Sequence, residues 1–179
     1  MIKWSPFKYR GTTYDLSHLH PFQMTVSQPA TQNKPERHYK IQVFFSLHCF
    51  TKSKKGEINV DKDLICSDNR EDRVFDFKRY ELSKNLRNIV QKIGQKRCLH
   101  TGHGNYFIIE ILNEQQEKIQ YEVYFKLSRG KKLLNLYIES AYPRSNDAAH
   151  KSGHKKKKPI RFTVLAYNIQ VGKKIKVPK

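Results

Sequence analysis

Apolar and polar residues alternate with a period of two through five segments of this 179-residue chain. The segments are 39–49, 106–112, 121–128, 134–142 and 160–166. Successive side chains of a β-strand point to opposite faces, so this period is typical of strands that bury one face. In the second segment apolar residues fill both sets of positions, which predicts a strand buried on both faces. We therefore expect five strands.

The links between three of these segments are short and rich in turn-forming residues. They comprise residues 113–118 and residues 129–132 around Gly130. Short links favour antiparallel neighbours, because parallel strands need a long crossover. We expect the segments 106–112, 121–128 and 134–142 to form an antiparallel run.

One segment has a helical period instead. Its apolar residues recur at spacings of three and four: Leu82, Leu86, Ile89, Val90 and Ile93. Gly94 follows at the position of a left-handed C-terminal cap, and Asp76 or Ser83 can cap the start. The pattern predicts an α+β fold in which one main helix packs on a curved antiparallel sheet, with long basic loops.

The length of the chain suits one domain with a real hydrophobic core. Within a single domain spanning 1–179, we expect an irregular N-terminal arm over 1–37 and a core of sheet and helix over 38–144. A mobile basic loop over 145–158 and C-terminal strands over 159–179 complete the prediction. The polar stretch 51–73 is expected to be a long loop.

Two features bear on location. No apolar run reaches the roughly 18 residues of a membrane-spanning helix, and the N-terminus lacks the apolar stretch of a secretory signal. The three cysteines, Cys49, Cys66 and Cys98, are odd in number and irregularly spaced, so reduced thiols are expected. We predict a cytoplasmic protein without a membrane partner.

The net charge of +19 is concentrated towards the C-terminus, since residues 130–179 carry +11 of it. Such an excess favours polyanions, and nucleic acid is the common case, with RNA favoured over DNA. An acidic, antitoxin-like protein is the alternative partner, and a solvated loop is the alternative role of the lysine run. The residues predicted to bind nucleic acid are Arg129, Lys131, Lys132, Lys155, Lys156, Lys157, Lys158 and Arg161.

A glycine-rich bend follows the predicted helix and holds Cys98, His100 and His103. Imidazoles titrate near neutral pH, so the two histidines are candidates for proton transfer to a phosphodiester. The same three side chains are zinc-type ligands, with Cys66, Cys49 or His48 as a fourth, although the spacing fits no strong zinc signature. A purely structural role is the third alternative. His48 itself is expected to be a hydrogen-bonded surface group.

The predicted strand 134–142 ends in hydroxyl groups. Ser140 and Tyr142 fall on the same face as Leu136 and Ile138, with Arg144 just beyond. Two hydroxyls near a guanidinium can position a phosphate, and Arg129 of the neighbouring strand is expected to join them. The alternative is a strand end closed by proline with Tyr142 half-packed.

The tetrapeptide Ser140-Ala141-Tyr142-Pro143, at the end of an antiparallel strand in a basic α+β chain, resembles the barnase, EndoU, colicin and RelE-like toxin ribonucleases. The resemblance covers at most residues 98–169. It implies an RNA 2′-hydroxyl nucleophile, side chains as acid, base and charge stabiliser, and no metal or other cofactor. Ser140 and Tyr142 match the motif itself, and we add His100 or His103 for proton transfer and Arg129 or Arg144 for phosphate binding. The predicted catalytic residues are therefore His100, His103, Ser140, Tyr142 and Arg144.

Two further functions stay open. The first is a non-enzymatic RNA- or DNA-binding module that stacks bases on Tyr124, Tyr137 and Tyr167. The second is a metal-dependent DNA nuclease built on Glu110, Glu122 and Lys126. Nucleotide-binding glycine motifs and H-E-x-x-H are absent from the sequence. The favoured prediction is a metal-independent endoribonuclease of toxin or defence type.

Overall fold

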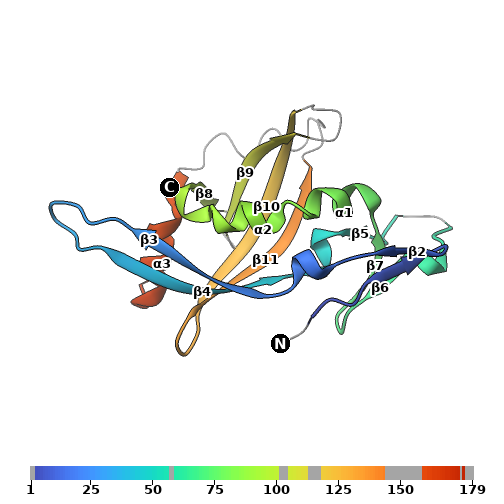
Figure 1. The fold of residues 1–179 in the computed structure, drawn as a ribbon, viewed down its shortest axis with the longest axis horizontal. Helices are drawn as coiled ribbons and strands as arrows, with labels where there is room; N and C mark the ends of the chain where they lie inside the picture. The colour runs from blue at the N-terminus through green and yellow to red at the C-terminus, as the bar shows by residue number, and fades with distance from the viewer. Residues whose placement is uncertain are drawn as a thin grey trace.

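The computed structural model describes residues 3–56, 59–100, 105–112, 118–143, 159–173 and 175, with the backbone alone for 100, 105–112, 118 and 119. Its centre is a twisted seven-stranded sheet of order β12-β8-β9-β10-β11-β4-β3 (Figure 1). The strands are β3 (Phe22–Gln28), β4 (Arg37–Phe45), β8 (Arg97–His100), β9 (Asn105–Leu112), β10 (Lys118–Arg129), β11 (Leu134–Pro143) and β12 (Pro159–Arg161). Neighbours are antiparallel except β4 and β11, which run parallel.

One face of this sheet carries the core, as the alternation predicts. Its fully or nearly buried residues include Tyr39, Ile41, Val43 and Phe45 of β4, Val123 and Phe125 of β10, and Leu134, Leu136 and Ile138 of β11. The helices α1 (Phe77–Ser83), α2 (Leu86–Gln91) and α3 (Phe162–Gln170) add their own buried residues to the same cluster. The α+β class and the antiparallel run β9-β10-β11 are confirmed.

The predicted main helix is divided into α1 and α2. The Asp76 side chain accepts from the backbone N–H of Arg79, so the expected N-cap is confirmed. Gly94 is not a left-handed cap; it lies in the 3-10 turn Ile93–Gln95. A Cβ at Gly94 would lie 2.7 Å from Cγ1 of Val26, so glycine is needed there for close packing on β3.

The predicted C-terminal strand is wrong beyond residue 161. Strand β12 ends there, and α3 follows directly. Phe162, Leu165 and Ala166 are buried at helical spacing, while Val164 is 41% exposed. The segment fits both periods, and packing selects the helix because it sets Phe162 against Phe125, with ring centroids 5.9 Å apart.

The arm 1–37 is not irregular. It contains a hairpin of β1 (Phe7–Tyr9) and β2 (Thr12–Tyr14), a 3-10 turn (Ser17–Leu19) and strand β3. Arg10 and Gly11 have φ of 47° and 77°, which is the backbone of a two-residue hairpin turn. The ring of Phe7 stacks on Phe75 at 4.1 Å, so the hairpin is held by aromatic packing.

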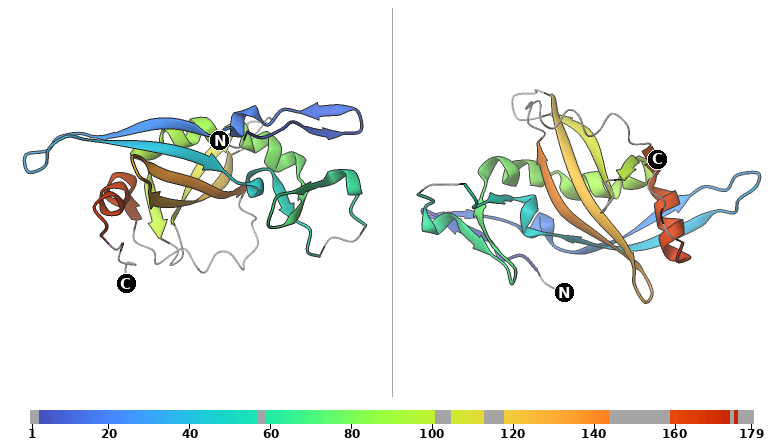
Figure 2. Two further views of the ribbon diagram at one scale, coloured as in Figure 1. Left: turned by 90° about the horizontal axis from the view of Figure 1, so that it is seen from below. Right: turned by 180° about the vertical axis from the view of Figure 1, so that it is seen from behind.

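The segment 51–73, which was expected to be a long loop, contains β-strands. It contributes to a three-stranded antiparallel sheet of order β5-β7-β6, with β5 (Thr51–Ser53), β6 (Ile65–Ser67) and β7 (Asp72–Phe75). The 3-10 turns Leu47–Cys49 and Lys62–Leu64 flank its strands. Figure 2 places this small sheet and the β1–β2 hairpin at one end of the molecule, opposite the β3–β4 hairpin.

Candidate nucleic-acid interface

The face of the large sheet opposite the core, here called the open face, combines rings and cations. Phe44 of β4 and Tyr137 of β11 are register partners, with ring centroids 6.5 Å apart, and both are half-buried. Tyr124 of β10 is half-buried as well, and Lys40 and Lys126 are exposed. These side chains alternate along their strands with the core residues, so the open face presents aromatic rings bordered by positive charge.

A β-bulge in β11 reverses the face of the sheet to which the side chains at the end of this strand point. Tyr124 pairs with Ser140, whereas the next residue, Phe125, pairs with Ile138, so Glu139 is extra. Beyond the bulge Ala141 is fully buried, and Ser140 and Tyr142 lie on the open face. The prediction that Ser140 and Tyr142 share the face of Leu136 and Ile138 is therefore wrong.

The two hydroxyl residues line a cavity of about 450 Å³, here called the bulge cavity. Its lining is Ser46, His48, Arg70, Glu71, Tyr124, Tyr137, Glu139, Ser140 and Tyr142. Arg70 and Glu71 come from the turn between β6 and β7, where the Asp68 carboxylate accepts from their backbone N–H groups at 2.9 and 3.1 Å. The Arg70 guanidinium reaches the Tyr137 hydroxyl at 3.5 Å. The cavity thus lies where the small sheet meets the open face.

A chain of hydrogen bonds fixes one imidazole at this cavity. Nε2 of His48 lies 2.5 Å from Oε1 of Glu71, and Oε2 of Glu71 accepts from Arg73 at 3.1 Å. These two contacts hold the pKa of the Glu71 carboxyl below its usual range, His48 having the larger effect. The Arg73 side chain is only 10% exposed and also donates to Thr51 Oγ1 at 2.8 Å.

Tyr142 is held by neighbours on the open face and at the strand edge. Its ring stacks on Tyr124 with centroids 5.6 Å apart, and the Arg79 guanidinium lies 5.1 Å from its centroid. The Tyr124 hydroxyl donates to the buried Glu122 carboxylate at 2.7 Å. Burial first, and then hydrogen bonds with Tyr142 and Glu122, raise the pKa of Tyr124, so its hydroxyl stays protonated. In the described chain, Arg79 is the guanidinium beside Tyr142.

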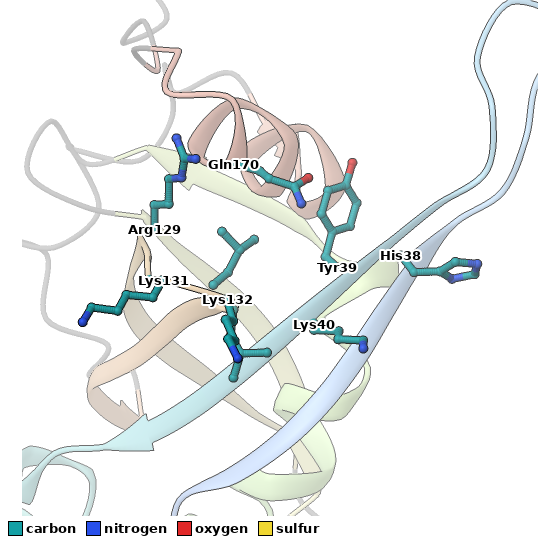
Figure 3. A pocket seen from close by; sticks show the side chains of 10 residues that line it. His38, Tyr39, Lys40, Arg129, Lys131, Lys132 and Gln170 are labelled. Atoms are coloured by element: carbon teal, nitrogen blue, oxygen red, sulfur yellow. The ribbon is translucent and has the colours of Figure 1, made fainter.

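A second cavity, of about 260 Å³, lies at the turn between β10 and β11 and is here called the hairpin cavity. Its lining is His38, Tyr39, Lys40, Arg129, Gly130, Lys131, Lys132, Leu133, Leu134 and Gln170, without an acidic residue. Figure 3 shows Tyr39 and Gln170 pointing toward each other while Lys131 and His38 point outward. Three predicted nucleic-acid-binding residues, Arg129, Lys131 and Lys132, are thus brought together.

Positive charge continues from the hairpin cavity onto α3. The Arg37 guanidinium lies 4.1 Å from the ring centroid of Tyr167, and Lys173 Nζ lies 5.8 Å from it. The hydrogen bond from Arg37, and then the charges of Arg37 and Lys173, lower the pKa of Tyr167. Tyr167 is on a helix, so its predicted place on the sheet with Tyr124 and Tyr137 is wrong.

Arg129, Arg161 and His100 lie away from Ser140 and Tyr142 in the bulge cavity. Arg129 lies at the opposite end of β10 from Tyr121, which pairs with Pro143, so it is about 25 Å from Tyr142 at 3.3 Å per residue. Arg161 pairs with Arg97 at the β12 edge. His100 ends β8, three strands from β11, which is roughly 14 Å at the usual strand spacing. His103, Arg144 and Lys155, Lys156, Lys157 and Lys158 lie outside the described residues, as does the predicted loop 145–158.

The three cysteines are free, and burial raises the pKa of each thiol to about 12. They are therefore uncharged at neutral pH and poor metal ligands or nucleophiles in this state. Among the described residues no group of three or more His, Cys, Asp or Glu side chains is placed to hold a metal ion. The zinc alternative that includes His103 extends beyond these residues.

Sequence reasoning gave His48 only the role of a hydrogen-bonded surface group or a fourth zinc ligand, and it did not pair His48 with Glu71. A lone histidine after a strand carries no signal of its own, and its partner lies 23 residues away. The signal for Glu71 is the turn-forming sequence Ser67-Asp68-Asn69, which breaks the polar stretch between β6 and β7. As a hairpin turn, this sequence predicts that residues 68–71 lie at the tip between two antiparallel strands.

Comparison with known proteins gives one family. The model of the YjaZ family matches residues 6–170. Protein YjaZ of Escherichia coli (strain K12) is 33% identical over 179 residues, which cover 98% of this chain and 96% of that protein. No solved structure matches. Among the described residues, no helix is both long and apolar enough to cross a membrane.

Proposed function

This chain belongs to the YjaZ family, and from its structure we propose that it binds nucleic acid, single-stranded RNA favoured over DNA, across the open face of its large sheet. One observation carries the proposal: Tyr124 and Tyr137 line the bulge cavity on the open face together with Arg70, and their strands β10 and β11 meet at the basic turn of the hairpin cavity. Aromatic rings beside cations match the bases and phosphates of a nucleic-acid strand.

The charge of the hairpin cavity supports contact with phosphates. Arg129, Lys131 and Lys132 come from one tight turn, and Lys40 faces them from β4. No carboxylate lines this cavity to offset them. Together with the net charge of +19, this arrangement draws a polyanion to this end of the sheet by long-range attraction.

The rings support a single strand as the form bound. A base presents its flat face to a tyrosine only when it is unstacked, and a duplex keeps that face covered. Tyr137 is half-buried against Phe44, so its ring is supported from one side and has surface left for a ligand. The roughly 25 Å from Leu134 to Tyr142 along β11 gives room for several nucleotides.

The hydroxyl groups of the bulge cavity support RNA. Ser140 and Tyr142 lie on the open face beside Tyr124, within the same cavity as Tyr137. A ribose 2′-hydroxyl both donates and accepts hydrogen bonds, and deoxyribose has no equivalent group. Hydroxyl side chains beside stacked bases therefore favour RNA.

Fluorescence anisotropy at low salt tests the proposal with one sequence in three forms: single-stranded RNA, single-stranded DNA and RNA duplex. We expect the tightest binding for single-stranded RNA and the weakest for the duplex. Absence of binding to all three, or tighter binding to the duplex, would contradict it. An acidic protein partner would be indicated if a polyglutamate bound more tightly than any nucleic acid.

A further inference from the structure

The imidazole of His48 is oriented by a chain of side-chain contacts, although it lies at the surface. Glu71 orients it, Arg73 orients Glu71, and Arg73 is anchored on Thr51 inside the small sheet. The chain of hydrogen bonds ends at an open cavity, where the His48 side chain keeps 31% of its surface exposed. An oriented imidazole with access to a ligand is the arrangement that proton transfer needs.

The nitrogen that is left for chemistry follows from this hydrogen bond. With Nε2–H donating to the Glu71 carboxylate, the neutral ring carries its lone pair on Nδ1. The negative charge of Glu71 stabilises the imidazolium that forms when Nδ1 takes a proton. Glu71 and Arg73 are therefore positioning residues, and His48 is the base.

A proton donor lines the same cavity. The Tyr137 hydroxyl accepts from Arg70, so its own hydrogen is available to a ligand. The guanidinium stabilises the phenolate that would remain after the proton leaves. Arg70 is also 62% exposed, which leaves it able to approach a phosphate oxygen. Arg73 lies 3.1 Å from the Glu71 carboxylate and offsets its charge, which weakens the repulsion of a phosphate by the carboxylates of the lining, Glu71 and Glu139.

On the premise that RNA binds the open face, we propose that the bulge cavity cleaves it by internal phosphoryl transfer. Nδ1 of His48 takes the proton of a 2′-hydroxyl, the 2′-oxygen bonds to the adjacent phosphorus, and the bond from phosphorus to the 5′-oxygen breaks. Tyr137 gives its hydroxyl proton to that 5′-oxygen. The products are a 2′,3′-cyclic phosphate and a 5′-hydroxyl, and the proton on His48 returns to Tyr137 through solvent.

This assignment moves the predicted acid–base pair from His100 and His103 to His48 and Tyr137. It keeps Ser140 and Tyr142 as cavity residues that contact the ribose. It needs no oxidant or co-reactant, because the transfer is internal to the RNA chain. A 2′-O-methyl RNA has no proton to lose and should bind without being cleaved.

The test follows end-labelled single-stranded RNA with chelator present and compares wild type with His48→Gln and Tyr137→Phe. We expect wild type to give 2′,3′-cyclic phosphate ends, and each variant to lose kcat by about 10²–10⁴-fold while RNA affinity is unchanged. His20→Gln is the matched control, since His20 bonds the Trp4 carbonyl away from the bulge cavity and should leave cleavage unchanged.

The variant His48→Ala allows a second measurement, rescue by imidazole, which is not expected if His48 has only a structural role. Added imidazole should restore part of its cleavage. Glu71→Gln should lower kcat with KM unchanged, and Glu81→Gln, at an exposed ion pair with Lys84, is its control.

Four results overturn the inference: RNA bound but intact, cleavage that stops with chelator, cleavage of 2′-O-methyl RNA, or full activity in His48→Gln. The first of these leaves the proposed binding function standing. A protein that binds no RNA overturns both.

Discussion

Oε1 of Glu71 lies 2.5 Å from Nε2 of His48 and so joins the small sheet to the large one. His48 follows β4 at the end of the large sheet, and Glu71 lies in the turn between β6 and β7. Arg70 of the same turn donates to the Tyr137 hydroxyl. The two contacts hold this turn beside the open face, where the bulge cavity lies.

The bulge at Glu139 predicts opposite tolerance at two adjacent positions. Ala141 is fully buried, so Ala141→Asp should destabilise the fold by about 3–5 kcal/mol by burying an unpaired charge. Ser140→Asp, on the open face, should cost far less. Urea denaturation of both variants measures the difference. Equal destabilisation at the two positions would show that the face assignment is wrong.

The sequence pattern predicts the strands whose two faces differ. Alternation locates β4, β10 and β11, and the link around Gly130 correctly predicts an antiparallel pair. It does not reveal the parallel pairing of β4 with β11, because that pairing joins residues about ninety positions apart.

The features that the sequence pattern does not predict depend on tertiary packing. Residues 160–166 satisfy both a strand period and a helix period, and only the packing of Phe162 against Phe125 distinguishes them. A one-residue bulge leaves no mark in composition, yet it moves Ser140 and Tyr142 to the other face. The small sheet has strands of three and four residues, too short for a period to show.

Close packing at Gly94 gives a prediction for stability. In Gly94→Ala the new Cβ would lie 2.7 Å from Cγ1 of the buried Val26, and such overpacking costs about 1–3 kcal/mol. Val26→Ala removes the clashing methyl, so the same Gly94 substitution should cost less in that background. A double-mutant cycle by chemical denaturation tests this coupling. Strict additivity would mean that the two side chains do not meet.

His18 makes stability depend on pH near neutrality. It bonds Ser83 at 2.8 Å, and burial first, with Lys84 adding to it, lowers its pKa below the ordinary 6.5. Its contribution is therefore fully present above pH 6.5 and lost as pH falls through the lowered pKa. His18→Gln should show a smaller drop in urea midpoint from about pH 7.5 to about pH 5.5. An identical drop in both proteins would refute the assignment.

The hairpin cavity makes a prediction about salt. Replacing Lys131 and Lys132 by Gln should weaken RNA binding and reduce the log–log salt slope by about 0.7 for each phosphate that is no longer neutralised. Lys8→Gln is the control, because Lys8 is exposed on the β1–β2 hairpin at the other end of the molecule. A slope that stays the same in the double variant would remove the hairpin cavity from the interface.

Affinity for single-stranded RNA in Tyr137 variants tests the central claim most directly. Tyr137→Ala should weaken binding by about 1–3 kcal/mol, the usual value of one stacked base, whereas Tyr137→Phe should bind like wild type. Tyr9→Ala, on the N-terminal hairpin, controls for removal of a tyrosine elsewhere. Wild-type affinity in a folded Tyr137→Ala protein would contradict RNA binding on the open face.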